Sequence, residues 1–320
     1  MHMGKAVLAA LLLVALAGCQ SKRSAPPTAS HHASSARAAK PVAQRSSPPP
    51  KPKAKPAPPT FAPALTTPLT QAVAGLAGTT SLYLGDPATG QTWTYHNGPQ
   101  RSASTIKLFV LGAAFAQAQA GRFALNATYV LQASDKVGGT GTIQGLPAGT
   151  TLTRQALLTK MIQVSDNTAT NIIITQLGGF GVVNAFARSI GATHTVLARK
   201  MLDTAALARG VDNRTTVADT GLLLTKLANH RLVSASADSA MLTMLAGQTN
   251  RSKLAAGAGS GITVYNKTGE YDQYGVENDA AIFRRGQRQR VIVMMSQGGT
   301  LSTQIPAFNA VGRLVAGQLQ

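Results

Sequence analysis

Ser104 and Lys107 are the first pair of residues in the chain whose types and spacing could carry out covalent chemistry. They open a segment, 104–118, whose apolar residues recur at helical spacing, so the two side chains share one helix face. The start of a helix favours negative charge developing on a serine oxygen. A desolvated lysine beside a second cation can have its pKa lowered until it serves as a base. The pattern predicts a nucleophilic serine activated by a lysine, although alone it also fits a capped surface helix.

Two later motifs carry groups that such a serine would need. Residues 165–167, Ser-Asp-Asn, lie between two predicted helices, and all three residue types are also good helix caps. Residues 267–269, Lys-Thr-Gly, directly follow a predicted strand, where a glycine would let a substrate backbone approach closely. The motifs start 61 and 102 residues apart (165 − 104 and 267 − 165). Each alone fits a structural role, but together they predict one site, and two lysines near one serine predict a positive pocket suited to an anionic substrate.

The segments around these motifs predict an α+β fold. Terminal helices are expected at 69–76, started by Thr67 and Pro68, and at 302–319. Alternating or β-rich segments predict five strands, at 81–84, 91–95, 262–266, 278–283 and 291–296. Apolar residues at helical spacing predict six central helices, at 104–118, 153–163, 167–177, 182–190, 216–227 and 236–245. We expect one five-stranded antiparallel sheet flanked by the terminal helices, with a mainly helical second lobe and a cleft between the lobes.

The N-terminus is typical of an exported protein. After Lys5, a run of 13 apolar or small residues ends at Gly18, which is too short to span a bilayer but suits a signal peptide. The chain's single cysteine, Cys19, follows Leu-Ala-Gly, and this run resembles a bacterial lipobox. We therefore expect a lipoprotein signal peptide at 1–18 and lipidation of Cys19; the alternative is an ordinary signal peptide with a chance cysteine. We therefore expect a cell-envelope protein that is anchored by lipid to a bacterial membrane, with its folded domain in the periplasm or outside the cytoplasmic membrane.

Residues 20–60 hold eight basic side chains, no acidic one and ten of the 16 prolines, within a chain whose formal net charge is +19. Such a composition cannot bury enough apolar surface to fold, so 19–65 is predicted to be a lipidated, semi-extended spacer and 66–320 the folded domain. The spacer has no aromatic residue to stack on bases, which argues against nucleic-acid binding. With one cysteine and no clustered histidines in the domain, we expect no metal and no other cofactor.

Taken together, the three motifs resemble those of the class A β-lactamase superfamily, in the branch of serine hydrolases that borders on penicillin-binding peptidases. The resemblance covers roughly residues 66–320. It includes Met161 and Ile162 before the second motif, residues 168–171 after it, and Asn278 with Asp279 in a late strand. It implies the two-lobed fold already described and an acyl-enzyme mechanism without a cofactor.

The resemblance also implies a role for each motif residue. Ser104 attacks the carbonyl of a β-lactam or a D-alanyl peptide, and Lys107 takes the serine proton. Ser165 relays a proton to the leaving nitrogen. The backbone N–H groups of Ser104 and Glu270 form the oxyanion hole. The groups implied to bind substrate are Asn167, for its amide side chain, and Lys267, Thr268 and Gly269, for its carboxylate end.

The chain departs from the class A pattern where the acyl-enzyme is hydrolysed. Its two glutamates, Glu270 and Glu277, both follow the third motif. If Arg199 matches the family's loop arginine, Met201 stands where the family has a glutamate that orients water. Asp203 is the nearest substitute, but we expect it to pair with Arg199. Acidic residues near the implied carboxylate site are also expected to weaken penicillin binding.

These observations leave three functions open for what we expect to be a monomer. The first is a β-lactamase-like serine hydrolase that is acylated by β-lactams or D-alanyl peptides and releases β-lactam products slowly. The second is a D-Ala-D-Ala carboxypeptidase or transpeptidase acting on the cell wall. The third is a non-catalytic lipoprotein that only binds wall peptides, such as those of peptidoglycan.

Overall fold

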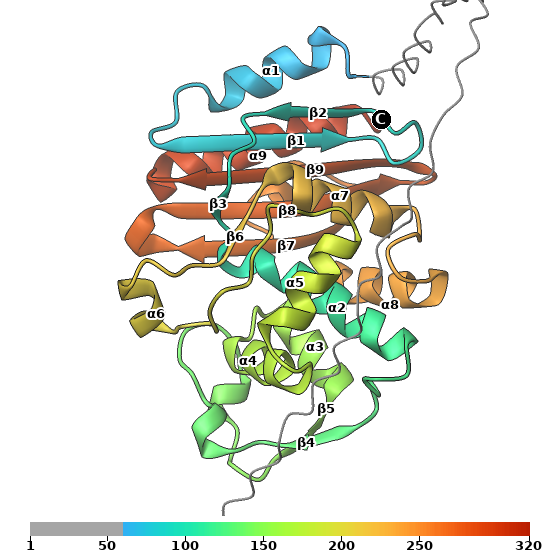
Figure 1. The fold of residues 1–320 in the computed structure, drawn as a ribbon. Helices are drawn as coiled ribbons and strands as arrows, with labels where there is room; N and C mark the ends of the chain where they lie inside the picture. The colour runs from blue at the N-terminus through green and yellow to red at the C-terminus, as the bar shows by residue number, and fades with distance from the viewer. Residues whose placement is uncertain (1–59) are drawn as a thin grey trace, which may run out of the picture. The chain divides into compact units, whose positions relative to one another are not determined.

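The computed structural model describes residues 60–320, so the predicted signal peptide, the lipidation of Cys19 and nearly all of the predicted spacer lie outside the described part. A five-stranded antiparallel sheet runs in the order β2-β1-β9-β8-β7. This sheet joins two early strands to three late ones, as predicted (Figure 1). The strands are β1 (Thr79–Gly85), β2 (Thr92–Tyr95), β7 (Thr263–Tyr271), β8 (Val276–Arg285) and β9 (Arg288–Gln297).

The two terminal helices, α1 (Pro63–Val73) and α9 (Leu301–Gly317), cover one face of the sheet. Alternate strand residues such as Leu82, Phe283 and Met294 pack against them in one buried cluster. The predicted start of the first helix at Thr67 and Pro68 is wrong. Pro63 takes the first helical position, where a missing N–H costs nothing, and Pro68 lies inside the helix.

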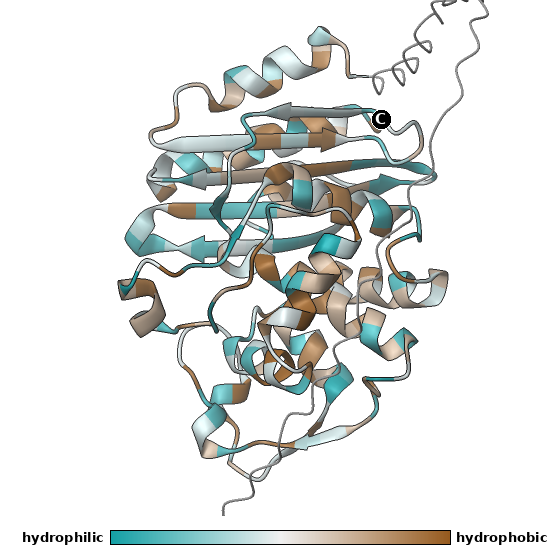
Figure 2. Ribbon diagram, viewed as in Figure 1, coloured by the Kyte–Doolittle hydropathy of each residue, from teal (hydrophilic) through white to brown (hydrophobic). Residues whose placement is uncertain are grey.

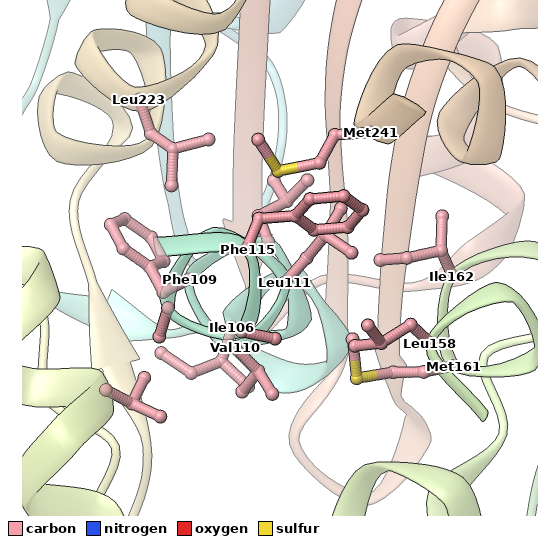
Figure 3. Packing of buried hydrophobic residues seen from close by; sticks show 14 of the residues in the cluster. Ile106, Phe109, Val110, Leu111, Phe115, Leu158, Met161, Ile162, Leu223 and Met241 are labelled. Atoms are coloured by element: carbon pink, nitrogen blue, oxygen red, sulfur yellow. The ribbon is translucent and has the colours of Figure 1, made fainter. Parts of the chain in front are cut away.

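The central helices pack on the other face of the sheet and form the second lobe (Figure 1). The first of them runs through the middle of this lobe. Phe109, Leu111 and Phe115 from that helix meet Leu158 and Met241 from its neighbours (Figure 3). Hydrophobic segments gather where these helices meet (Figure 2). The helices are α2 (Lys107–Gln119), α3 (Arg154–Gln163), α4 (Asn167–Gln176), α5 (Phe180–Ser189), α7 (Val217–Ala228) and α8 (Ala235–Ala246).

Several short elements were not predicted from the sequence. Strand β3 (Gln100–Arg101) pairs with β6 (Arg214–Thr215), and β4 (Thr128–Val130) pairs with β5 (Thr151–Thr153). A five-residue helix, α6 (Thr204–Ala208), lies in the loop before β6. The β3–β6 pair links the turn that leads into α2 with the end of this loop.

Within residues 60–320, no single helix is both long and apolar enough to cross a membrane. Only α4 and α5 together pass by length and composition, and they are bent by 84° at the break between them.

Candidate active site

Ser104 lies in a single 3₁₀ turn, Ala103–Ile106, that leads directly into α2. Its backbone enters this turn through Ala103, whose φ of 42° is in the left-handed region that non-glycine residues rarely adopt. Backbone strain of this kind persists only where the surrounding structure enforces it, and it occurs often at functional sites. The predicted placement of a serine at a helix start therefore holds, with a tighter first turn than expected.

Two buried ammonium groups meet at the hydroxyl of Ser165. Lys107 Nζ donates to Ser165 Oγ at 3.1 Å, and also to Ser165 O at 2.7 Å and Asn167 Oδ1 at 2.9 Å. Lys267 Nζ donates to the same Ser165 Oγ at 3.1 Å and to Thr268 O at 2.7 Å. The structure thus brings residues from all three motifs together, although they are far apart along the chain. Ser165 itself has a φ of 54°, a second strained position at the site.

Burial and mutual repulsion change the protonation of the two lysines. Both side chains have no exposed surface, and burial disfavours the charged form of a lysine. Burial, reinforced by the charge of Lys267, lowers the pKa of Lys107 well below its ordinary value. Burial lowers the pKa of Lys267 to about 8. Both shifts favour loss of a proton at a lower pH than an exposed lysine would need, and the two positive charges oppose each other.

Asp166, the middle residue of the second motif, organises the backbone around this network. Its Oδ1 caps α4 by accepting from Ala169 N at 2.8 Å, and its Oδ2 accepts from Thr142 N at 2.6 Å and Ile143 N at 2.8 Å. Asp166 is almost fully buried. Its role is structural, because it fixes the neighbouring Ser165 and Asn167 between two packed segments.

Gly269 lets β7 approach the nucleophile. A Cβ atom at this position would lie 2.8 Å from Ser104 N and 3.0 Å from Thr105 N, closer than real Cβ atoms come. The prediction that the strand ends before the Lys-Thr-Gly motif is wrong, because β7 continues to Tyr271, paired with Val276 of β8. The backbone of Gly269 thus passes directly beside that of Ser104.

A cavity of about 410 Å³, the Ser104 cavity, opens beside this serine. Asn167 and Glu270 line it together with Ser104. Met201 and Asp203 line it as well. Lys107, Ser165, Lys267 and Thr268 are buried behind this lining.

The expected pairing of Asp203 with Arg199 is wrong. Asp203 Oδ1 instead caps α6, accepting from Ala206 N at 2.8 Å. Arg199 bonds Asp212, with Nε and Nη2 each 2.8 Å from Asp212 Oδ1. Asp212 lies at the far end of the loop, where β6 begins, so it closes the loop on Arg199 without using the nearer carboxylate.

The loop that carries Met201 is held at both ends. Asn171 accepts from Met201 N at 2.8 Å and donates to Met201 O at 3.1 Å, which fixes the backbone of a residue whose side chain is almost buried. Asp212 also pairs with Arg101, whose guanidinium lies 3.8 Å from the ring centre of Tyr274. Sequence reasoning missed these supporting residues, since no local spacing connects them.

Lys253 is the other residue that the sequence did not reveal. It is buried and bonds two carboxylates, Glu270 at 2.8 Å and Glu277 at 2.5 Å. Glu270 and Glu277 are directly paired across β7 and β8. Burial raises the pKa of Glu277 despite the charge of Lys253. Burial opposes the ionisation of Glu270 as well, but Lys253, Lys267 and hydrogen bonding by Lys253 and Thr268 together hold the pKa of Glu270 below its ordinary value.

The surface of the Ser104 cavity contradicts the expected positive pocket. The charged side chains that line it are Asp203, Glu270, Asp272 and Arg199, and Arg199 is already bonded to Asp212. No group of three or more His, Cys, Asp or Glu residues in the described chain is placed to hold a metal ion. The site therefore combines a serine at a helix start, a buried lysine whose pKa is lowered well below its ordinary value, and a lining that is acidic on balance.

Nearly all of the described part of the chain is similar to known proteins. Residues 64–319 match the family described as Beta-lactamase enzyme family. The β-lactamase OXY-2 of Klebsiella oxytoca is 34% identical over 193 residues, which are 58% of this chain and 65% of that protein. The β-lactamase CTX-M-97 of Escherichia coli is 32% identical over 182 residues, 56% of this chain and 62% of that protein. The chain thus spans just under two thirds of the length of these relatives.

Solved structures match over more of their length. A β-lactamase of Sphaerobacter thermophilus aligns with a TM-score of 0.71 at 29% identity, covering 80% of this chain and 96% of that one. PBP-A aligns with a TM-score of 0.74 at 25% identity, covering 82% and 98%. A mutant of PBP-A, solved as an acyl-enzyme complex with penicillin G, aligns equally well.

Proposed function

The chain belongs to the beta-lactamase enzyme family, and from this premise we propose that it is a serine hydrolase that forms an acyl-enzyme on Ser104 with β-lactams or D-alanyl peptides. One observation carries the proposal: the ammonium groups of Lys107 and Lys267 both lie 3.1 Å from Ser165 Oγ, next to a cavity that Ser104 lines. The acyl-enzyme complex of the PBP-A mutant with penicillin G supports covalent chemistry on this fold.

The proposed first half of the reaction uses these groups as follows. Ser104 Oγ bonds to the substrate carbonyl carbon while its proton passes to neutral Lys107. The carbonyl oxygen gains negative charge, which the N–H groups of Ser104 and Glu270 stabilise, typically by about 2.7–4 kcal/mol per donor. The carbon–nitrogen bond then breaks. Ser165 passes its hydroxyl proton to the leaving nitrogen and regains one from protonated Lys107, to which it is bonded. The product is an ester on Ser104.

The second half needs a water molecule and a base to activate it. Met201 lines the cavity, but a thioether cannot accept a proton under these conditions. The Asp203 carboxylate also lines the cavity but caps α6. We therefore expect the ester formed with a β-lactam to be hydrolysed slowly.

Intact-mass analysis after mixing the protein with penicillin G tests the proposal. We expect a long-lived adduct of one penicillin per chain, and no adduct on the Ser104→Ala variant. Both proteins should unfold at similar temperatures, since Ser104 is only half-buried. Absence of an adduct together with absence of penicillin hydrolysis would favour a wall-binding protein without catalysis. Rapid hydrolysis without an adduct would contradict slow deacylation.

The rate of acylation should first rise and then fall as the pH increases. It should rise as Lys107 loses its proton, because only the neutral amine accepts the serine proton, and the pKa of Lys107 is lowered well below its ordinary value. It should fall as the pH rises through the pKa of Lys267, about 8, because the cation at Ser165 is then lost. Second-order acylation constants measured from about pH 5 to pH 10 check both limbs.

A matched variant identifies the alkaline limb. Arginine keeps its charge throughout this range, so Lys267→Arg should retain a rising limb and lose the fall above about pH 8. An unchanged alkaline limb in this variant would assign the fall to another group.

A cell-wall peptidase is the second candidate, because the acylation chemistry is the same and only the fate of the ester differs. Met201, rather than a glutamate, stands at the loop position that lines the cavity, and this favours a peptidase over an efficient β-lactamase. Release of the terminal residue from a D-alanyl-D-alanine peptide, abolished by Ser104→Ala, would distinguish this activity.

A further inference from the structure

The charge of the surface that lines the Ser104 cavity is opposite in sign to the net charge of the chain. The full sequence carries a formal charge of +19, yet three of the four charged side chains lining the cavity are acidic, namely Asp203, Glu270 and Asp272. The fourth, Arg199, is bonded to Asp212, which it shares with Arg101, so the lining side chains remain acidic on balance by three carboxylates to one guanidinium. A concave site of one charge sign concentrates ligands of the opposite sign and repels those of its own.

Glu270 is the acidic lining residue that is next in sequence to the strand segment beside Ser104. It directly follows Gly269, whose backbone passes beside Ser104 N, and its own N–H is the second donor proposed for the oxyanion hole. Its side chain remains 30% exposed. Because Glu270 and Ser104 line the same cavity, we expect the groups of a substrate that are bonded close to the scissile carbonyl to lie near the Glu270 carboxylate.

The Glu270 carboxylate is held in place rather than free to swing away. Asn250 Nδ2 and Lys253 Nζ both donate to its Oε1, at 3.0 and 2.8 Å. Lys253 is nearly fully buried and also donates to Gly269 O and Asn278 O, so it cannot follow a ligand. The carboxylate would have to give up both partners before it could leave the cavity wall.

Lys253 does not cancel the charge of Glu270, because it is shared with a second carboxylate. Glu277 lies 2.5 Å from the same Nζ atom. Glu277 is buried and is not among the residues that line the cavity. The three side chains together carry an excess negative charge when both carboxylates are ionised, and only Glu270 presents that charge to a ligand.

We propose that Glu270 determines substrate specificity, disfavouring acyl substrates with a free carboxylate near the scissile bond and favouring those that are neutral or cationic there. The proposal rests on the proposed acyl-enzyme function and names its substrate class: esters, carboxyl-amidated peptides, or peptides with an ammonium group beside the scissile bond. A penicillin would still acylate Ser104, but more slowly than the same compound without its charge.

Penicillin G and penicillin G methyl ester form a matched pair of probes, since they differ only in the carboxylate. The second-order acylation constant of the full chain should be smaller for the acid than for the ester. In Glu270→Gln, the acid-to-ester ratio should rise by about tenfold, the effect of removing one like charge a few ångströms from the ligand. Glu277→Gln leaves Lys253 to pair with Glu270 alone and keeps the Glu270 carboxylate at the cavity wall, so it should raise the ratio by clearly less than Glu270→Gln does.

An unchanged ratio in Glu270→Gln, or an equal rise in Glu277→Gln, would overturn the inference while leaving the acyl-enzyme intact. If neither probe acylates any variant, the covalent function fails, and binding decides the inference instead. On a Ser104→Ala background, the ester should bind more tightly than the acid, and Glu270→Gln should reduce that preference by about tenfold. Equal affinities, or no binding of either probe, would overturn it as well.

Discussion

Replacing Lys107 with methionine is expected to slow the acylation of Ser104 by about 10²–10⁴-fold, the usual contribution of a positioned base. Methionine fills a similar volume in the buried site but cannot accept the serine proton. It also removes the three hydrogen bonds that Lys107 Nζ makes to Ser165 and Asn167. The measurement is the rate at which the penicillin adduct forms, followed by intact mass at several penicillin concentrations.

Lys107→Arg separates the two functions of this residue. Arginine keeps a cation near Ser165 but does not lose its proton. If Lys107 acts as the base, Ser104 in the arginine variant should therefore be acylated about as slowly as in the methionine variant. Recovery of most of the native rate in the arginine variant would mean that only the positive charge matters. Thermal unfolding of both variants should accompany the kinetics, to exclude loss of the fold.

Replacing Met201 with glutamate is expected to shorten the lifetime of the penicillin adduct by about 10²–10⁴-fold. Met201 lines the Ser104 cavity, and Asn171 holds its backbone on both sides. A carboxylate at this position would be attached to a backbone that Asn171 already holds in place. It would accept a proton from a water molecule that attacks the ester on Ser104. The rate of loss of the adduct after removal of free penicillin gives the result.

Met201→Gln is the matched control, because glutamine has the size and polarity of glutamate but cannot accept a proton at neutral pH. Its adduct should persist like that of the natural chain. Equal acceleration by glutamate and glutamine would mean that added polarity or altered packing, rather than a base, limits deacylation. The rate of adduct formation should change little in either variant.

The sequence predicted much of the fold because its signals are local. Strands such as 291–296 were clear from a short β-rich run, and the helix after Ser104 was clear from its apolar spacing. The sheet followed from pairing early strands with late ones. The two-residue strands β3 and β6 could not be found in this way, because a pair so short has no periodicity of its own and exists only through its tertiary setting.

The site residues likewise divide into those that local sequence motifs reveal and those that depend on the tertiary structure. Ser104, Lys107, Ser165 and Lys267 were identifiable because their types form recurring motifs. The partner of Arg199 was not, since nearness in sequence favoured Asp203 whereas the loop closes through Asp212. Lys253 was also missed: a lysine is seldom fully buried, and its two carboxylate partners follow it by 17 and 24 residues (270 − 253 and 277 − 253). The acidic character of the cavity depends on which charges are buried behind its wall, and spacing alone does not show this.

The β3–β6 pair has a consequence for how the chemistry can evolve. Ser102 N donates to Asn213 O at 3.0 Å, two residues before the nucleophile and at the exit of the loop that carries Met201. In the proposed mechanism, formation and breakdown of the ester therefore depend on segments that are physically tied together. A mutation that moves this loop to speed product release would also move the turn that carries Ser104, because the bond joins them. The two half-reactions would therefore be expected to evolve together.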